Sequence, residues 1–509
     1  MSELYFLRWL EFQMFIAIGA FWGVVIARAA PAGATVQIID IPAGVAQDTL
    51  RQFAQQTACQ IVFSPETVRD VPTHAIRGEL SILTALTRML EGTSLMAVQD
   101  GKTRAFAVLR KRASPKESSV VLPVIRRVAD PSRPGLAWAV TVADVPLVIT
   151  GQLLPWGIDG AIAQGAAAQV KQLLANLEVV LAECGSSLES TVRLNLYVVQ
   201  PEITKLIMPA VAARYANAPV ALTLVQTSLA DERALVALDA IAARTGSSPI
   251  KGGESYFASG LPRPRLGAHA FILPAGRKIF IAGRAEKGAD MAEGAGKSLS
   301  SLIATLRHLE LEPVHAAQVK AYFNPGLGGW VMLEEQVRLA FGDHSPAFSA
   351  VEWKSETPAE IEMLAYASEA RTPGDPLVFL MPAGPARSAR YSRMVDVAAG
   401  QSLIFTAGLH GARGDSPFRQ METIFGRLGG ILAETGGSFR HLVKATYYQT
   451  DPESLRANKA YQDTYYDRRR PPAMSGAIAA GTGREGVTAS FDWIGVPVPD
   501  DEAVGYPGN

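Results

Sequence analysis

The stretch "APVALTLV", residues 218–225, places a proline directly before a run of apolar and β-branched residues that is typical of a β-strand. Similar phrases recur as "SPAFSAVE", 345–352, and "PPAMSGAI", 471–478. The prolines of the three phrases lie 127 and 126 residues apart. This period is too long for a solenoid repeat and fits copies of a whole domain, so the 509-residue chain is expected to contain three related domains.

Each phrase stands near the end of the same order of predicted elements. A strand such as "VITGQ", 148–152, is followed by a long helix whose apolar residues recur at helical spacing, namely Val170, Leu173, Leu174, Leu177 and Leu181. The next strand carries a basic residue in each copy, matched as Arg193, Lys320 and Lys444. A second helix then leads to the proline phrase. The order predicts α+β domains over residues 133–244, 255–370 and 387–497.

These three segments resemble the RidA (YjgF/YER057c/UK114) family. The first copy carries the resemblance in "AAAQVKQLLANLEVVLAECGSSLESTVRLNLYV" and "APVALTLV", and the third in "LAETGGSFRHLVKATYYQTD" and "PPAMSG". The resemblance implies chorismate-mutase-like domains that associate in threes, with sheets inside and helices outside. Three tandem copies would close such a ring within one chain. We therefore expect an intramolecular pseudo-trimer that is a monomer overall, with three independent domains as the alternative.

The resemblance also implies a chemistry that this chain alters. Deaminases of the family hydrolyse enamines and imines in clefts between neighbouring domains, where an arginine two residues after the proline pairs with the substrate carboxylate. Arginine suits this role because its planar fork binds a carboxylate bidentately. The position holds Ala221, Phe348 and Met474, none of which can form an ion pair. We favour a protein without catalytic residues, and an imine or enamine hydrolase with altered clefts is the alternative.

Polar side chains that could line such altered clefts occur in all three copies. The resemblance implies an acidic residue on the last strand, which we match to Asp239 and Asp492, with Leu364 in the middle copy. Arg284 and Glu352 are polar additions of the middle copy. These residues are candidates for binding a small anionic or polar metabolite.

An aromatic hydroxyl completes the candidate set. The resemblance implies one before the first long helix, which we match to Tyr391 in the third copy, with Ala137 and His269 at the same place elsewhere. Tyr391 and His269 are therefore further ligand-binding candidates. The alternative interpretation of all six candidates is ordinary surface polarity and internal ion pairing.

Residues 35–111 indicate a smaller α+β unit of another kind. "TVQIIDIPA" alternates like a strand, "VAQDTLRQFAQQTA" has one apolar helical face, Ser81 is a candidate N-cap of a second helix, and "DG" suits a hairpin turn. This βαβ-type order resembles the secretin and TonB short N-terminal (STN) domain. The resemblance implies a periplasmic module that docks to an envelope protein partner.

The N-terminal residues 1–29 are predicted to be a secretory signal peptide. Residues 12–27 contain no charge, but as a helix they would span about 24 Å, less than a bilayer core of about 30 Å. Ala27 and Ala29 fit a cleavage site. We expect a periplasmic protein, with association to the outer membrane left open. The alternative is an inner-membrane anchor formed by residues 12–27. Either Met1 or Met14 is the start of translation.

Composition excludes several function classes. Lysine plus arginine and aspartate plus glutamate both number 48, so there is no electrostatic basis for nucleic-acid binding. The histidines and the two cysteines, Cys59 and Cys184, show no metal-ligand spacing, and no phosphate-binding loop indicates a cofactor. The cysteines are expected to be free thiols, with a disulfide as the alternative. Residues 112–132 are interpreted as a linker.

Overall fold

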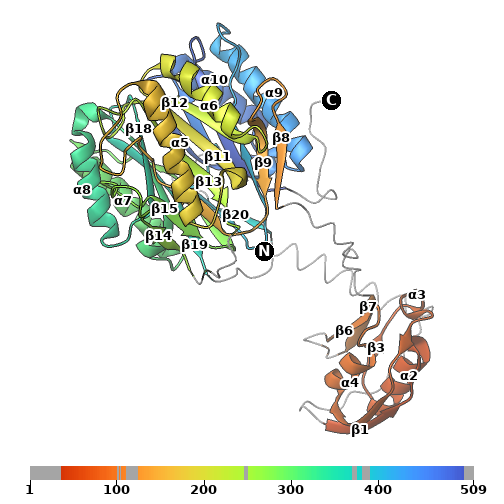
Figure 1. Ribbon diagram of the computed structural model, residues 1–509. Coiled ribbons are helices and arrows are strands. Elements are labelled where there is room, and N and C mark those ends of the chain that lie inside the picture. The colour runs from red at the N-terminus through yellow and green to blue at the C-terminus, as the bar shows by residue number, and fades with distance from the viewer. Residues whose placement is uncertain are drawn as a thin grey trace. The chain divides into compact units, whose positions relative to one another are not determined.

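The computed structural model describes residues 36–99, 103, 105–110, 124–245, 250, 252–368, 375–380 and 390–497. The chain divides into two compact units, Met1–Leu122 and Pro123–Asn509 (Figure 1). No helix in the described ranges is long and apolar enough to cross a membrane. The predicted leader 1–29, including residues 12–27, lies outside the described residues, as does the first part of the predicted linker 112–132.

The smaller unit is built from short strands and helices around one apolar core. Ser81 caps the second long helix as expected, because its Oγ accepts a hydrogen bond from the Thr84 N–H at 3.2 Å. The strand that precedes this cap was not expected, and it pairs antiparallel with the first strand. The elements are β1 Val36–Ile41, β2 Gly44–Val45, α2 Ala46–Thr57, β3 Ile61–Val62, α3 Pro65–Val68, β4 Pro72–Thr73, β5 Ile76–Ser81, α4 Ile82–Met89, β6 Leu95–Gln99 and β7 Phe106–Arg110.

The larger unit repeats one order of elements three times. The first segment, β8 to β13, contains β8 Ile125–Ala129, β9 Leu136–Val142, β10 Leu147–Thr150, α5 Ala166–Glu183, β11 Thr191–Val198, α6 Thr204–Arg214, β12 Val220–Gln226 and β13 Val236–Ala243. The second segment, β14 to β19, contains β14 Glu254–Tyr256, β15 Ala270–Leu273, β16 Arg277–Arg284, α7 Met291–His308, β17 Ala316–Phe323, α8 Gly329–Phe341, β18 Ala347–Glu352 and β19 Ala359–Ala367.

The third segment, β20 to β25, has the same order. It contains β20 Leu377–Leu380, β21 Met394–Val397, β22 Leu403–Thr406, α9 Pro417–Thr435, β23 Leu442–Gln449, α10 Pro452–Tyr465, β24 Ala473–Ile478 and β25 Ala489–Gly495. The strands β8, β14 and β20 each pair with the next strand of their own segment. β8 and β20 thus precede the predicted domain starts at 133 and 387, with β8 at the end of the predicted linker, whereas β14 lies at the predicted start of the second domain, residue 255.

Strand pairing joins the three segments in a cycle. β10 of the first segment pairs with β15 of the second, β16 of the second pairs with β21 of the third, and β22 of the third pairs with β9 of the first, all antiparallel. The pairing inside a segment is also repeated. The central strand β11 of the first segment pairs in parallel with β12 and antiparallel with β13, and β23 of the third segment pairs in the same way with β24 and β25. Two strands of each segment thus pair with a neighbouring segment, whereas β14, β24, β18 and β20 remain at the edges of the two sheets of this unit.

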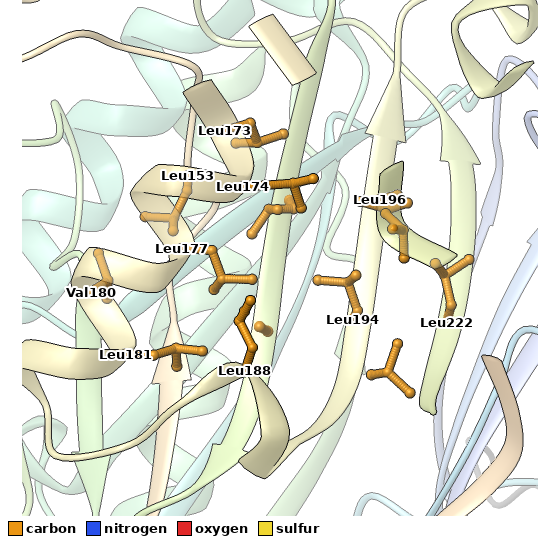
Figure 2. Packing of buried hydrophobic residues seen from close by; sticks show 14 of the residues in the cluster. Leu153, Leu173, Leu174, Leu177, Val180, Leu181, Leu188, Leu194, Leu196 and Leu222 are labelled. Carbon is orange, nitrogen blue, oxygen red and sulfur yellow. The ribbon is translucent and has the colours of Figure 1, made fainter. Parts of the chain in front are cut away.

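Two kinds of apolar core hold this unit together. The outer core of the first segment lies between its helices and its sheet: in Figure 2 Leu173, Leu177 and Leu181 of α5 face Leu194 and Leu196 of β11, and all five are buried. The helical spacing noted in the sequence therefore marks this buried face. A second, inner core takes residues from all three segments, including Val192, Phe280 and Phe405.

The pairing register corrects how the copies correspond. A β-bulge follows the first residue of β11, β17 and β23, so Thr191, Ala316 and Leu442 are equivalent. The residues two places further on are Arg193, Gln318 and Lys444. Matching Arg193 with Lys320 was therefore wrong by two residues, because a valine in each strand was aligned without the bulge.

The proline phrase is shifted by one residue in the first copy. Arg193 pairs with Ala221, Gln318 with Ala347 and Lys444 with Ala473, so the equivalent of Phe348 and Met474 is Leu222, not Ala221. Ala221 belongs to the inner core, whereas Leu222 belongs to the outer one. The conclusion that no arginine stands at this position is unchanged.

Two further matches change with the register. Asn195 pairs with Asp239, Lys320 with Glu362 and Thr446 with Asp492, which makes Glu362, not Leu364, the acidic residue of the middle copy. At or just before the start of β9, β15 and β21, Ala137, Ala268 and Ser392 pair in parallel with the equivalent alanines of the proline phrase. These three residues are therefore equivalent to one another. The residues equivalent to Tyr391 are therefore Leu136 and Gly267, not Ala137 and His269.

Candidate functional site

A cleft with six charged lining residues lies between the second and third segments. It has a volume of about 530 Å³, and we name it the Arg284 cleft. Arg284 and Tyr391, both predicted from the sequence, line it together, with Met474 at the position discussed above. The remaining charged lining residues are Glu286, Lys354, Glu360, Arg390 and Lys459.

Glu360, at the second position of β19, was missed by the sequence analysis. Its Oε1 accepts a hydrogen bond from the Gly476 N–H at 3.0 Å. A Cβ on Gly283 would lie 2.1 Å from the same oxygen, so the carboxylate fits only because residue 283 has no side chain. Burial raises the pKa of Glu360 to about 7, against the lowering effects of the Gly476 N–H and of Lys444.

Two hydrogen-bond donors of the Arg284 cleft are available to a ligand. Arg284 uses Nη2 to bind Glu286 at 2.7 Å and Nε to bind Ser301 at 3.2 Å, and the bonds of the described residues leave its Nη1 free. Gln449 also lines the cleft, and its buried side-chain nitrogen has no hydrogen-bond partner in the described part of the chain. Buried polar atoms of this kind are rare unless a ligand or water completes them.

Asp239 and Asp492 do not line this cleft but lie in the interior, where they are 1% exposed. Asp492 of the third segment binds Arg193 of the first, Oδ1 to Nη2, at 2.5 Å, and also accepts from Thr223 Oγ1 at 3.0 Å. Burial acts to lower the pKa of Arg193, but Asp492 raises it above its ordinary value. The alternative interpretation, an internal ion pair, is therefore what the geometry shows for Asp492.

The same scheme continues around the cycle of segments. Lys444 of the third segment binds Glu362 of the second, Nζ to Oε2, at 2.8 Å. Lys320 of the second segment donates to the Tyr197 hydroxyl at 2.9 Å, and Tyr197 donates in turn to Asp239 of the first. Asp239 also accepts from Asn195, within its own segment, at 2.6 Å. Each segment thus contributes a base and an acid to an interior polar network.

His269 and Glu352 lie at the junction of the first and second segments. His269 is 2% exposed, accepts from the Ala258 N–H through Nδ1 at 2.9 Å and donates from Nε2 to the Pro262 carbonyl at 2.9 Å. Burial lowers the pKa of His269 from its ordinary value. Glu352 accepts a long bond of 3.4 Å from the Ser228 N–H. Neither is brought together with Arg284 and Tyr391.

A second cleft, which we name the Trp330 cleft, lies between the first and second segments with a volume of about 490 Å³. Its lining includes the aromatic residues Trp156, Trp330 and Phe348. Arg265 also lines it and is paired with Glu334 at 3.0 Å, Nη2 to Oε2. This cleft therefore presents mainly aromatic surface and paired charges.

Neither a metal site nor a disulfide is found in the described ranges. No group of three or more His, Cys, Asp or Glu side chains there could hold a metal ion. Cys59 and Cys184 are free, and burial raises the pKa of the Cys184 thiol to about 12. Both thiols are free, which agrees with the first of the two interpretations of the cysteines.

No family model matches the chain, and no curated protein matches it. Solved structures do. A Rid-family protein of unknown function from Yersinia pestis is 32% identical over 24% of this chain and 98% of its own, with a TM-score of 0.22. A YjgF/YER057c/UK114 member from Mycobacterium tuberculosis is 23% identical over 18% and 79%, with a TM-score of 0.17. The ferripyoverdine receptor of the Pseudomonas aeruginosa outer membrane is 30% identical over 14% of this chain and 10% of its own, with a TM-score of 0.14.

Proposed function

We propose that this chain is a RidA-like protein of three tandem copies that binds a small anionic metabolite in the Arg284 cleft. The observation that carries the proposal is the joint position of Arg284, Tyr391 and the Gln449 side-chain nitrogen, which has no partner among the described residues, around one volume of about 530 Å³. The fused arrangement of the copies is supported by the cyclic strand pairing between segments.

The charge of the lining favours an anion. Arg284 is paired with Glu286 and Arg390 with Asp463, whereas Lys354 and Lys459 add two further cations to the lining. Glu360, with its pKa raised to about 7, is about half protonated near neutral pH. A carboxylate ligand would therefore meet a net positive cleft with donors on Arg284 and Gln449.

Calorimetric titration with 2-oxobutanoate, a small keto acid, tests the proposal. Arg284→Ala is expected to weaken binding about tenfold or more, because a charge-assisted hydrogen bond to an anion is lost. Arg265→Ala is the matched control, since Arg265 lines the Trp330 cleft and is expected to leave the affinity unchanged. Absence of binding, or equal losses in both variants, would contradict the site.

A second candidate function, imine or enamine hydrolysis, is favoured by one observation, the raised pKa of Glu360. A base with a pKa near the working pH is suited to remove a proton from water as that water attacks an imine carbon, with the nitrogen leaving as ammonia. Without an arginine at the Met474 position, we expect turnover at least about 100-fold below that of a family deaminase. The assay generates an amino-acid-derived imine in situ and detects keto acid; turnover that is lost in Glu360→Gln would favour hydrolysis over binding alone.

The smaller unit is proposed to be an STN-like module that docks to an envelope protein, on a chain exported to the periplasm. The support is the order of elements between β1 and β7 together with the sequence of residues 1–29. Mass spectrometry of cell fractions tests export: a mature N-terminus near residue 30 in the periplasm is expected. An intact N-terminus in the inner membrane would favour the anchor, and recovery from the cytosol alone would exclude both.

The full chain is proposed to be a monomer with internal pseudo-three-fold symmetry. Since β9, β10, β15, β16, β21 and β22 already bind one another within the chain, the surfaces that a separate copy would need are occupied. Sedimentation equilibrium should give the mass of one chain, about 54.3 kDa before any cleavage. An obligate trimer would contradict this.

A further inference from the structure

A cluster of arginines lies where the third segment meets the first. The guanidinium carbon of Arg427, on α9, lies 4.4 Å from the ring centroid of Trp138 on β9, and that of Arg133 lies 5.0 Å from the same centroid. Arg427 also donates from Nη1 to the carbonyl of His410 at 3.4 Å. Arg484, between β24 and β25, is close enough to lower the pKa of His410. We name Arg133, Arg427, Arg484 and His410 the arginine cluster.

The cluster holds more positive charge than its surroundings neutralise. Arg133 is paired with Asp130, which is fully buried. In the described part of the chain neither Arg427 nor Arg484 has a carboxylate within ion-pair distance. The neighbouring pair Arg413–Glu485 is largely exposed, at 68% and 75%, and is complete in itself. Asp130 also acts on Arg427, so among the described residues this carboxylate is shared by two of the three guanidinium groups and the cluster keeps an excess of positive charge.

The titration of these groups agrees with mutual repulsion. Burial, together with Arg133, lowers the pKa of Arg484 to about 10, and the same two causes lower the pKa of Arg427. Burial and Arg484 lower the pKa of His410 to about 4. The lowered pKa values mean that burial and neighbouring positive charge disfavour the charged forms of these side chains. An anion placed among them would stabilise the charged forms.

His410 adds a constraint on the kind of anion. Its Nδ1 bonds to the Gly411 carbonyl at 2.9 Å, so Nδ1 carries the proton and Nε2 of the neutral ring is an acceptor. That Nε2 is buried without a hydrogen-bond partner among the described residues. An anion that keeps one O–H group could donate to Nε2 while its other oxygens accept from the arginines. Hydrogenphosphate has this form near neutral pH, and sulfate does not.

We propose that the arginine cluster binds free phosphate in its hydrogenphosphate form. Guanidinium groups suit this role because they pair with phosphate oxygens through two parallel hydrogen bonds. The site uses none of the residues that line the Arg284 cleft. Its failure would therefore leave the proposed metabolite binding untouched, and the reverse also holds.

Thermal unfolding and calorimetric titration of the full chain test the proposal with inorganic phosphate, methyl phosphate, sulfate and chloride at matched ionic strength. Phosphate is expected to raise the unfolding temperature more than sulfate, and sulfate more than chloride. Methyl phosphate has a second pKa of about 6 and keeps little O–H at neutral pH, so it should raise the unfolding temperature less than inorganic phosphate does. An equal response to both anions would contradict the hydrogen bond to His410 Nε2.

Arg484→Gln is expected to weaken phosphate binding about tenfold or more. In phosphate-free buffer it should also raise the unfolding temperature, because a repelled charge is removed. Arg413→Gln, on an exposed and paired arginine nearby, is the control and should change neither quantity. If Arg484→Gln fails to fold, Arg427→Gln replaces it. Equal stability of the wild type in phosphate and chloride, or equal losses of affinity in Arg484→Gln and Arg413→Gln, would overturn the proposal.

Discussion

Strand β19 carries one glutamate of the interior network, Glu362, and one of the Arg284 cleft, Glu360, and the pKa values of the two are shifted in opposite directions. Glu362 faces the interior and is bound by Lys444 at 2.8 Å; burial acts to raise the pKa of Glu362, but Lys444 and Lys320 lower it. Glu360, two residues earlier, is bound by a backbone N–H instead, and burial raises its pKa to about 7.

The difference shows what decides whether a buried carboxylate is part of an internal ion pair or can take up a proton. Both side chains point to the same side of the strand, since alternate residues share a face. Only the partner differs, a lysine for Glu362 and a peptide N–H for Glu360. A buried carboxylate paired with a lysine stays ionised and cannot lose that partner without destabilising the fold, whereas one without such a partner keeps a proton that a reaction or a ligand can use.

The largest expected effect comes from breaking the interior pair. Glu362→Gln leaves Lys444 buried and without its carboxylate, and the free energy of unfolding should fall by about 3–5 kcal/mol at pH 7. Denaturant unfolding followed by near-ultraviolet circular dichroism measures this. Glu422→Gln is the control, because Glu422 and its partner Arg419 are exposed and solvent screens their attraction, so little change in stability is expected. Equal effects of the two changes would mean that Glu362 has no special role.

Glu360→Gln should act in the opposite direction and only above a certain pH. The pKa of Glu360 is higher in the folded chain, about 7, than its ordinary value of 4.5, so the native state loses stability as the pH rises through this window. Glutamine imitates the protonated form and avoids that loss. The variant should match the wild type near pH 4.5 and exceed it by about 3 kcal/mol at most above pH 7.

Unfolding free energies measured at several pH values check this prediction. A variant that is less stable than the wild type at pH 8 would contradict it. Glu362 gives the reverse pattern, since its lowered pKa contributes stability that is present above the ordinary value and lost as the pH falls. The two glutamates should therefore be separable by pH alone.

Much of the fold, but less of the site, could be predicted from the sequence. Leu173 and Leu177 showed the buried face of α5, and the three proline phrases located the repeated strands, because both signals are local. Register is not local. A shift of one residue moved the assignment from Leu222 in the outer core to Ala221 in the inner one, since neighbouring strand residues face opposite sides.

Glu360 was beyond the sequence for a related reason. Its buried position depends on Gly283 leaving room for the carboxylate and on the Gly476 N–H that binds it, which belong to β16 and β24 and are far from it in the chain. The alternation "AEIEM" at 359–363 is the signal that could have indicated two acidic residues on one strand face. It could not have told which of the two has a lysine partner.

Gly283→Ala should bring the pKa of Glu360 closer to the ordinary value of a glutamate. The added Cβ would lie 2.1 Å from Glu360 Oε1, so the carboxylate must move, at a cost of about 1–3 kcal/mol in stability. Its pKa should then fall toward 4.5, which carboxyl-carbon NMR titration would follow. Gly426→Ala in α9, where nothing lies within 4 Å of the new Cβ, is the control and should leave stability equal or higher. A pKa that stays near 7 in Gly283→Ala would show that the carboxylate does not depend on this space.

The smallest change in stability is expected for Glu352, which belongs neither to the interior network, like Glu362, nor to the Arg284 cleft, like Glu360. It ends β18, is partly exposed, and its only side-chain bond among the described residues is the 3.4 Å contact with the Ser228 N–H. Its own N–H donates to Thr227 Oγ1 at 2.7 Å, and a substitution of the side chain leaves that bond in place. Glu352→Gln should therefore change the free energy of unfolding by less than about 1 kcal/mol at any pH between 5 and 8, because a weak, partly exposed contact is all that changes. It should also leave the affinity for 2-oxobutanoate as it is, since Glu352 does not line the Arg284 cleft. A loss of affinity comparable to that of Arg284→Ala would restore Glu352 to the site and show that the cleft extends to the junction with the first segment.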